Sequence, residues 1–242
     1  MTTNAHTLTV AGLKVSVVRK DIKNLHLGVY PPDGRVRVAV PPTVSDAAVR
    51  VAVIGKLRWI KRQRAAFEHQ AREGAREMVS GETHYFLGRR YRLEVVATTS
   101  ASHVTLRGRS IIVLHARPEL TTAKREHVLY QWYRERLREQ AAPLIAKWQK
   151  VLHVNVADWR IKRMKTKWGS CTAEARRIWL NLELAKKAPE CLEYIVVHEL
   201  VHLLVRHHDD AFHALMDRYF PRWRQVRRDL NAAPLVHATW SY

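Results

Sequence analysis

One apolar segment in the C-terminal third constrains the fold more than any other part of the chain. It contains the pattern His198-Glu199-Leu200-Val201-His202. Side chains four residues apart lie on one face of an α-helix, so both imidazoles can bind the same metal ion. Glu199 lies about 100° further round the helix, beside the ion instead of in its first coordination shell. This arrangement is typical of zinc hydrolases, in which the metal lowers the pKa of a bound water to roughly 7 and the carboxylate acts as general base.

The residues around this pattern are apolar on almost every side of the predicted helix. Between Leu192 and Val205 most of the other positions are Leu, Val, Ile or Tyr, which predicts a helix buried in the core. Burying two imidazoles and an ionised carboxylate without partners costs on the order of several kcal/mol. A metal ion that takes the imidazole lone pairs removes this cost. The alternative is a pair of core histidines whose ring nitrogens are satisfied by backbone carbonyls.

A hydrolytic zinc ion has three protein ligands and one open position. No glutamate follows the motif, so the candidates for the third ligand are the downstream His and Asp residues His207, His208, Asp209, Asp210, His213 and Asp217. His208 is favoured because it lies six residues after His202, the spacing of H-E-x-x-H-x-x-G-x-x-H zincins. Those proteins turn at a glycine where this chain has Val205, so we expect a differently built turn. His207 and His213 remain alternatives.

Composition limits the class of protein. With 242 residues, of which 47% are hydrophobic, the chain can bury a sizeable core in one or two domains. It contains no apolar run of 18 residues and its first residues are polar, so we expect a soluble protein without an export signal or a membrane span. The two cysteines, Cys171 and Cys191, predict neither a disulfide framework nor a CxxC zinc site. A reducing cytoplasm is therefore the expected location.

The charge is strongly positive, with 42 Lys and Arg against 22 Asp and Glu and a formal net charge of +20. Such a field attracts polyanions, which makes nucleic acid a possible partner. The cations are spread along the chain, and no helix-turn-helix, zinc-finger or RRM signature accompanies them. The charge alone is equally compatible with a role in solubility.

Hydrophobic patterning predicts a β-rich N-terminal region, residues 1–118, followed by a catalytic region, residues 119–242. Alternating segments predict four strands at residues 8–10, 15–18, 25–30 and 36–40. A helix capped by Ser45 is expected to run to about Arg72, followed by hairpins within residues 83–96 and 104–115. From Thr121 to about Leu152 the pattern predicts a long amphipathic helix, which Pro143 should kink or divide.

A second informative stretch precedes the motif helix. Residues 154–168 are expected to form a strand that enters a turn at Gly169, answered by a strand at 177–184, with Pro189 beginning the helix. An edge strand beside a zinc site can bind an extended peptide by strand addition. Five cations surround this edge, and they either clamp an acidic substrate, stabilise a reaction oxyanion or protect the edge from aggregation. They are Arg160, Lys162, Arg163, Lys165 and Lys167.

These motifs together resemble the YgjP-like metallopeptidase-domain family, which is related to the SprT-like and WLM zincins. The resemblance is carried by Arg163-Met-Lys-Thr-Lys-Trp-Gly-Ser-Cys171, Ile178-Trp-Leu-Asn181, Val196-Val-His-Glu-Leu-Val-His-Leu203, His208 and Phe212. Residues 19–27 and 56–61 also fit, so the resemblance covers most of the chain. The family usually has Asn-His-Ser at the third ligand and Phe-Trp after it, where this chain has His207-His208-Asp209 and Phe212-His213.

The resemblance implies an α+β, zincin-like minimal metalloprotease fold with a β-rich N-terminal part and a helical catalytic half. It implies Zn²⁺ held by His198, His202 and His208, with Glu199 as general base in the hydrolysis of peptide bonds. The expected partner is then a protein or peptide substrate. Two alternatives are a metal-dependent nucleotide phosphohydrolase and a basic nucleic-acid-binding module with a structural zinc.

Overall fold

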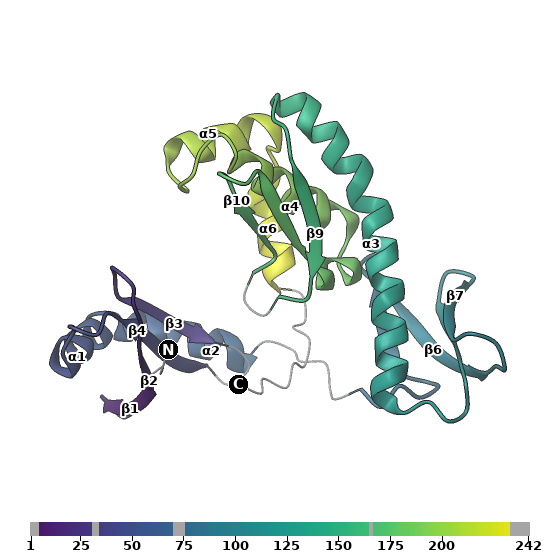
Figure 1. Ribbon diagram of the computed structural model, residues 1–242, viewed down its shortest axis with the longest axis horizontal. Helices are drawn as coiled ribbons and strands as arrows, with labels where there is room; N and C mark the ends of the chain where they lie inside the picture. The colour runs from purple at the N-terminus through teal and green to yellow at the C-terminus, as the bar shows by residue number, and fades with distance from the viewer. Residues whose placement is uncertain (1–4, 31–33, 70–75, 165–166, 233–242) are drawn as a thin grey trace. The chain divides into compact units, whose positions relative to one another are not determined.

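The computed structural model describes residues 5–30, 34–69, 76–164 and 167–232. They form two compact units (Figure 1). The first runs from strand β1 (Ala5–Val10) to helix α2 (Leu57–His69), and the second from β5 (Thr83–Phe86) to α6 (Trp223–Ala232). The division between these two units lies between α2 and β5.

The first unit is a four-stranded sheet with two helices. Its strands β1, β2 (Leu13–Arg19), β4 (Arg35–Val40) and β3 (His26–Tyr30) lie in this order. The central pair β2 and β4 is parallel, and the two outer pairs are antiparallel. Valines on one face of β2 and β4 pack with Val49 and Val53 of α1 (Asp46–Gly55) and Ile60 of α2. The two helices thus help to bury one face of the sheet.

The single helix expected from Ser45 to about Arg72 is two helices, which corrects that prediction. Ser45 does cap α1, since its side chain accepts the N–H of Ala48 at 3.2 Å. The helix ends at Gly55 because Lys56 leaves helical geometry, at φ −107° and ψ 9°. The Lys56 N–H bonds the Val53 carbonyl at 3.1 Å, a shorter-range bond that tightens the last turn. The expected end of the helix, beyond His69, lies outside the described residues.

The second unit begins with another four-stranded sheet, ordered β5, β6 (Arg89–Ala97), β8 (Ile111–Ala116) and β7 (His103–Arg107). The predicted hairpins β5–β6 and β7–β8 are both confirmed. Helix α3 (Thr122–Leu152) runs from this sheet toward the remaining elements (Figure 1). Phe86 of β5 packs on Trp132 of α3, with ring centroids 4.7 Å apart. Because the sheet and α3 share one core, they belong to the same unit.

Helix α3 is continuous although Pro143 lies inside it. The proline therefore does not divide the helix. Its core side holds Leu137, Ala141, Ile145 and Trp148, all buried. Packing of these residues offsets the lost backbone hydrogen bond at the proline. Both parts of the second unit pack along this helix, the sheet through β7 and β8 and the remaining elements through η1 and α4.

A three-stranded sheet, ordered β10 (Gly169–Thr172), β11 (Arg177–Asn181) and β9 (Asp158–Lys162), precedes the motif helix. It corrects two predictions. The expected single strand at 154–168 is β9 alone, which pairs with β11 in parallel, and Gly169 begins β10 instead of forming a turn. The hairpin turn lies at residues 173–176, where Arg176 takes a left-handed φ of 45°. The 177–184 strand ends at Asn181, where a 3₁₀ turn, η1 (Leu182–Lys186), starts.

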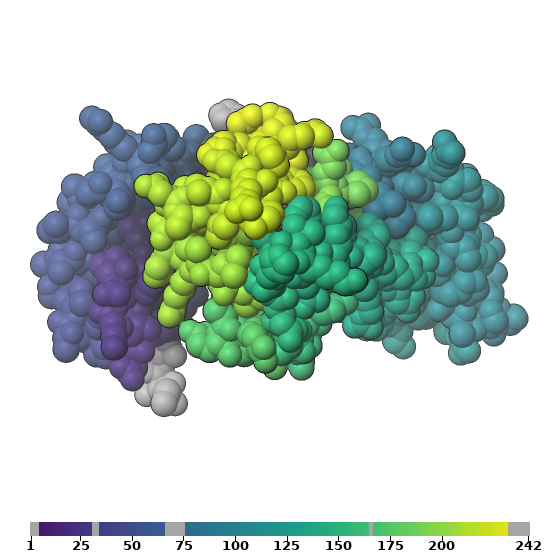
Figure 2. Space-filling model, turned by 90° about the horizontal axis from the view of Figure 1, so that it is seen from above, coloured from purple at the N-terminus to yellow at the C-terminus, as the bar shows by residue number. Residues whose placement is uncertain are grey.

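Helix α4 (Pro189–Val201) contains the motif and lies in the core, as predicted. Its residues Val196, Val197, Leu200 and Val201 are fully buried. It packs against α3, β10, β11 and the last two helices, α5 (Asp210–Tyr219) and α6. Figure 2 shows α5 and α6 at the surface of this unit. The mixed architecture, with sheets first and helices last, confirms the predicted α+β class.

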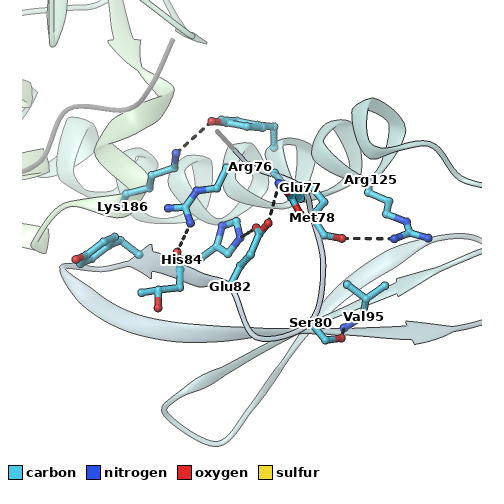
Figure 3. A network of polar contacts seen from close by, with 12 residues as sticks. Arg76, Glu77, Met78, Ser80, Glu82, His84, Val95, Arg125 and Lys186 are labelled. Atoms are coloured by element: carbon cyan, nitrogen blue, oxygen red, sulfur yellow. Dashed lines mark hydrogen bonds and ion pairs between the residues drawn. The ribbon is translucent and has the colours of Figure 1, made fainter. Parts of the chain in front are cut away.

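A buried polar network joins β5 to the segment before α4 (Figure 3). Glu82 binds the imidazole of His84 at 3.1 Å through one oxygen and accepts the Glu77 N–H at 2.7 Å through the other. Burial, helped by the Arg76 guanidinium, lowers the pKa of His84 to about 4, so this ring is neutral at pH 7. Lys186 of η1 is held at 2.8 Å from the Glu183 carboxylate. The link to η1 is made by the backbone, since the N–H groups of Leu87 and Gly88 donate to the carbonyls of Ala185 and Lys186 at 3.0 and 3.1 Å.

Candidate metal centre

Three imidazoles converge at the C-terminal end of α4. Nε2 of His208 lies 3.1 Å from Nε2 of His202 and 3.1 Å from Nε2 of His198. Ligand atoms of all three residues lie within 4.8 Å of one another. Nitrogens that bind one tetrahedral zinc at about 2.0–2.1 Å are roughly 3.3 Å apart, which matches these separations. The donor set therefore fits a single ion.

The turn that brings His208 back toward the helix is made without a glycine. After α4 the N–H of Leu203 bonds the Leu200 carbonyl at 3.0 Å, and those of Leu204 and Val205 both bond the Val201 carbonyl at 2.9 Å. This tightened last turn replaces the left-handed residue that a glycine would supply. Val205, which stands at the glycine position, does not have a positive φ.

Val205 also orients one of the imidazoles. Nδ1 of His202 lies 3.1 Å from its carbonyl oxygen, so the Nδ1–H donates to it. This bond leaves the Nε2 lone pair of His202 for a metal ion. His198 differs, because its Nδ1 is buried and has no hydrogen-bond partner among the described residues.

The three rings are in the protonation state that binds metals. Burial lowers the pKa of His198 to about 3, with further lowering from His202 and His208. Burial is also the main cause that lowers the pKa of His202 and of His208. Neutral imidazoles offer a lone pair without first losing a proton. His208 is the exposed member of the group, so the site opens to solvent on its side.

The other candidate ligands have different roles in the structure. Asp209 caps α5, where its Oδ1 accepts the Phe212 N–H at 3.0 Å. Asp217 accepts from Nε1 of Trp223 at 2.7 Å. The ring of His213 stacks on Trp223 with an interplanar angle of 5°. His207 and Asp210 are exposed and do not belong to the converging group.

Phe212 forms an aromatic wall behind the imidazoles. Its ring centroid lies 5.0 Å from that of His198, 4.8 Å from His202 and 4.7 Å from His208. The side chain is only 1% exposed. Asp209, the N-cap of α5, lies between His208 and Phe212 in the sequence. The cap therefore helps to position both the third imidazole and the Phe212 ring.

The carboxyl group of Glu199 is buried beside strand β10. The residue is 4% exposed, and burial raises its pKa to about 8, while Lys167 lowers it. A Cβ atom added to Gly169 would lie 2.3 Å from Oε1 of Glu199. The carboxyl group therefore occupies the space that the glycine leaves open. In the sheet, β10 has one neighbour, β11, so the strand beside Glu199 is an edge strand.

Asn181 fixes the segment that leads into β10, a role that the sequence analysis did not assign to it. The side chain is 4% exposed. Its Nδ2 donates to the carbonyls of Met164 at 2.9 Å and Lys167 at 2.7 Å, and its Oδ1 accepts the Met164 N–H at 3.2 Å. The backbone N–H of Asn181 bonds the Trp168 carbonyl at 2.9 Å. In the sequence, the only signal was a polar Asn between the apolar residues Leu180 and Leu182 of the predicted 177–184 strand.

The cations around this sheet have separate partners. Arg160 binds Asp158 at 2.8 Å, and Arg163 lies 3.3 Å from the Glu183 carboxylate. Lys162 lies 6.0 Å from the centre of the Trp179 ring. Among the four cations that the structure describes, only Lys167 lowers the pKa of Glu199. Lys165 lies outside the described residues.

Cys171 of β10 lies near Glu199 but is not a nucleophile. Burial, Glu199 and Glu174 raise the pKa of its thiol to about 11, so it stays protonated at neutral pH. Cys191 is also free, and burial raises its pKa. Nucleophilic cysteine chemistry is therefore not supported at this site.

The site is typical of the class of metal-dependent hydrolases. It combines two imidazoles on one buried helix with a third from the following turn and an adjacent carboxyl group. The comparison with protein families narrows this class. The model of the YgjP-like metallopeptidase domain matches residues 23–233 of the chain. The chain belongs to this family of metallopeptidases.

Comparison with solved structures found partial similarity to two archaeal proteins. The metallopeptidase zymogen abylysin of Pyrococcus abyssi is 21% identical, with 37% of this chain and 90% of that chain covered and a TM-score of 0.35. The metallopeptidase zymogen jannalysin of Methanocaldococcus jannaschii is 23% identical, with 38% and 87% covered and a TM-score of 0.35. Comparison with curated proteins found no match. Membership therefore rests on the family match.

Replacing Gly169 with Ala tests the contact between β10 and Glu199. The added methyl group would meet the carboxyl group at 2.3 Å, so one of the two must move. We expect hydrolysis to fall by at least about tenfold, because small displacements of a catalytic group cost up to about 100-fold. Zinc content should stay unchanged. Gly55, with nothing within 4 Å of an added Cβ, is the control position, and the G55A variant should keep full activity. Full activity of the G169A variant would contradict the contact.

Proposed function

We propose that this chain is a zinc-dependent peptidase that hydrolyses peptide bonds in protein or peptide substrates. His198, His202 and His208 bind the Zn²⁺ ion, and Glu199 acts as general base. The observation that carries the proposal is the convergence of three Nε2 atoms, two of the separations being 3.1 Å, next to a buried carboxyl group. Membership in a metallopeptidase family supports the same reaction.

Three neutral nitrogen donors suit zinc, which prefers imidazole in a tetrahedral site. When bound, the ion supplies Lewis-acid chemistry that makes water acidic enough to attack a carbonyl near neutral pH. Glu199 accepts a proton from the attacking water and passes it to the leaving amine. The buried position raises the pKa of Glu199 to about 8, and a nearby dication would lower it again, so the group can both take and release a proton near pH 7.

The edge of β10 is the proposed site for the substrate backbone. An extended peptide that pairs with this edge gains main-chain hydrogen bonds independent of its sequence. Since Gly169 touches Glu199, a peptide bound there lies next to the general base. Asn181, which fixes the segment before β10, positions the edge without touching the substrate.

Lys167 is the cation that faces the reaction. It acts on Glu199, and its side chain is exposed. A positive charge at this point stabilises the carbonyl oxygen as it gains negative charge in the transition state. The other described cations of the group are paired with acidic or aromatic side chains.

The proposed location is the cytoplasm. Both cysteines are free, the state that a reducing compartment maintains. Among the described residues, no helix is long and apolar enough to cross a membrane.

The proposal is tested with full-length protein and unfolded casein as substrate. Removing metal with a chelator should abolish hydrolysis, and adding back one equivalent of Zn²⁺ should restore it. Nucleoside triphosphates are offered in parallel, with phosphate release as the readout. Metal-dependent phosphate release without any cleavage of casein would replace the peptidase by the phosphohydrolase. Zinc binding without either reaction would favour a structural zinc.

A further inference from the structure

The first unit has a sheet face directed away from its helical core. The valines at positions 15, 17, 36 and 38 belong to the core cluster formed with α1 and α2. Alternate residues of a strand point to opposite faces, so the intervening residues lie on the other side. We call this side the open face. It presents Thr9, Lys14, Ser16, Tyr30, Arg35 and Arg37, whereas Val18, further along β2 on the same side, is only 4% exposed.

Strand register gathers the cations of the open face at its centre. Arg37 of β4 is aligned with Ser16 of β2 on one side and Gly28 of β3 on the other. Arg35 is aligned with Tyr30, and Lys14 precedes the aligned pair Val15 and Val36. Arg35 and Arg37 are two residues apart on one strand, hence roughly 6.7 Å apart along it. This separation is comparable with that of successive phosphates along a nucleic acid strand.

Tyr30 adds an aromatic surface beside these cations. A Cβ atom at Gly28 would lie 2.7 Å from Cε2 and 2.9 Å from the hydroxyl oxygen of Tyr30. The far end of the ring therefore folds back over Gly28, so the ring lies along the sheet instead of standing out from it. The absence of a side chain at Gly28 leaves room for the ring in this position. A ring that lies along a sheet offers a π face on which a base can stack.

The described residues of the first unit carry an excess of positive charge. Residues 5–30 and 34–69 contain twelve Lys and Arg against three Asp and Glu, nearly half of the net charge of the chain in about a quarter of its length. Asp46, one of these acids, pairs with Arg19 at 2.7 Å and His6 at 3.0 Å at the start of α1. No open-face position of the described strands holds a carboxylate. The face thus attracts a polyanion.

We infer that the open face binds single-stranded nucleic acid. Lys14 and Arg37 contact phosphates, Thr9 and Ser16 donate hydrogen bonds to the sugar-phosphate backbone, and one base stacks on Tyr30. The combination of cations with an aromatic ring distinguishes this ligand from an acidic protein, because only nucleic acid alternates phosphates with flat bases. The binding is independent of the metal centre and of the reaction proposed for it.

The test uses full-length protein and a fluorescent oligothymidylate of about 20 nucleotides, long enough for several contacts. Fluorescence anisotropy is recorded over a range of salt concentrations. The variant K14Q/R37Q should bind at least about tenfold more weakly, and its salt slope should fall by about 1.4, since each lost phosphate contact to a single strand removes about 0.7. The matched control K61Q/R62Q removes two exposed charges of α2 and should change affinity less than about twofold.

The stacking step has its own pair of variants. Tyr30→Leu should weaken binding about tenfold, whereas Tyr30→Phe, which keeps the ring, should bind as the natural protein does. Circular dichroism and thermal midpoints confirm that each variant is folded. Equal losses in K14Q/R37Q and K61Q/R62Q would overturn the proposal by showing a diffuse charge effect. Poly-glutamate that competes as well as the oligonucleotide, or no measurable binding at low salt, would overturn it too.

Discussion

Replacing Glu199 with Gln is expected to remove peptide hydrolysis while zinc remains bound. Gln has the same shape, so the core packing around this 4%-exposed side chain is kept, but its amide cannot accept a proton. General acid–base catalysis contributes roughly 10²–10⁴-fold to a rate, and we expect a loss in this range. Hydrolysis of unfolded casein and zinc content are measured on the same samples.

The matched control for this variant is Glu190→Gln on the same helix. Glu190 lies in the first turn of α4 and is exposed, 3.7 Å from Arg222. The Glu190→Gln variant should keep full activity and full zinc content. If the E199Q variant hydrolyses casein at the natural rate, Glu199 is not the base. If the E199Q variant loses zinc, the role of Glu199 is to support the metal site.

Replacing His208 with Ala is expected to abolish stable zinc binding, whereas His207→Ala should not. The structure places His208 at 3.1 Å from both other Nε2 atoms and leaves its neighbour out of the group. Loss of a direct ligand should lower zinc affinity by more than about 100-fold, because even outer-shell partners are worth about 10–100-fold. The zinc-to-protein ratio is determined by mass spectrometry on protein purified without added metal.

These two adjacent positions form an unusually close comparison. Both side chains are exposed, so neither substitution leaves a cavity, and both remove one imidazole. Zinc lost from the H207A variant and retained by the H208A variant would reverse the assignment. Retention in both variants would mean that the two helix histidines bind zinc with a ligand from elsewhere.

The position of the motif helix and its burial could be predicted because they depend on local periodicity. His198 and His202 are four residues apart, which places both on one face of a helix. The apolar residues between Leu192 and Val205 lie on all sides of that helix, so they are removed from water only if the helix is buried. The six-residue spacing also identified His208 among its neighbours as the favoured candidate. The turn at Val205 could not be predicted, since a tightened helix end leaves no glycine or proline in the sequence.

The sheets were less predictable because strand pairing is a long-range property. Nothing local shows that β9 pairs with β11 in parallel, or that Gly169 begins a strand. Gly169 lacks a side chain because the carboxyl group of Glu199 occupies that space, and Glu199 is thirty residues away in the sequence. The break between α1 and α2 falls at Gly55, a stop signal that the otherwise continuous helical pattern concealed. The role of Asn181 depends on three segments that meet only in the folded chain.

The close approach of Gly169 to Glu199 has a consequence for which proteins could be digested. In the reaction that we propose, no side chain of residue 169 stands between Glu199 and the strand edge, so main-chain alignment selects the bond to be cut. Chains that are already unwound could then be cleaved at many different residues, whereas a tightly folded domain would offer no free backbone to align. Susceptibility would follow the loss of structure in the target more than the identity of its amino acids.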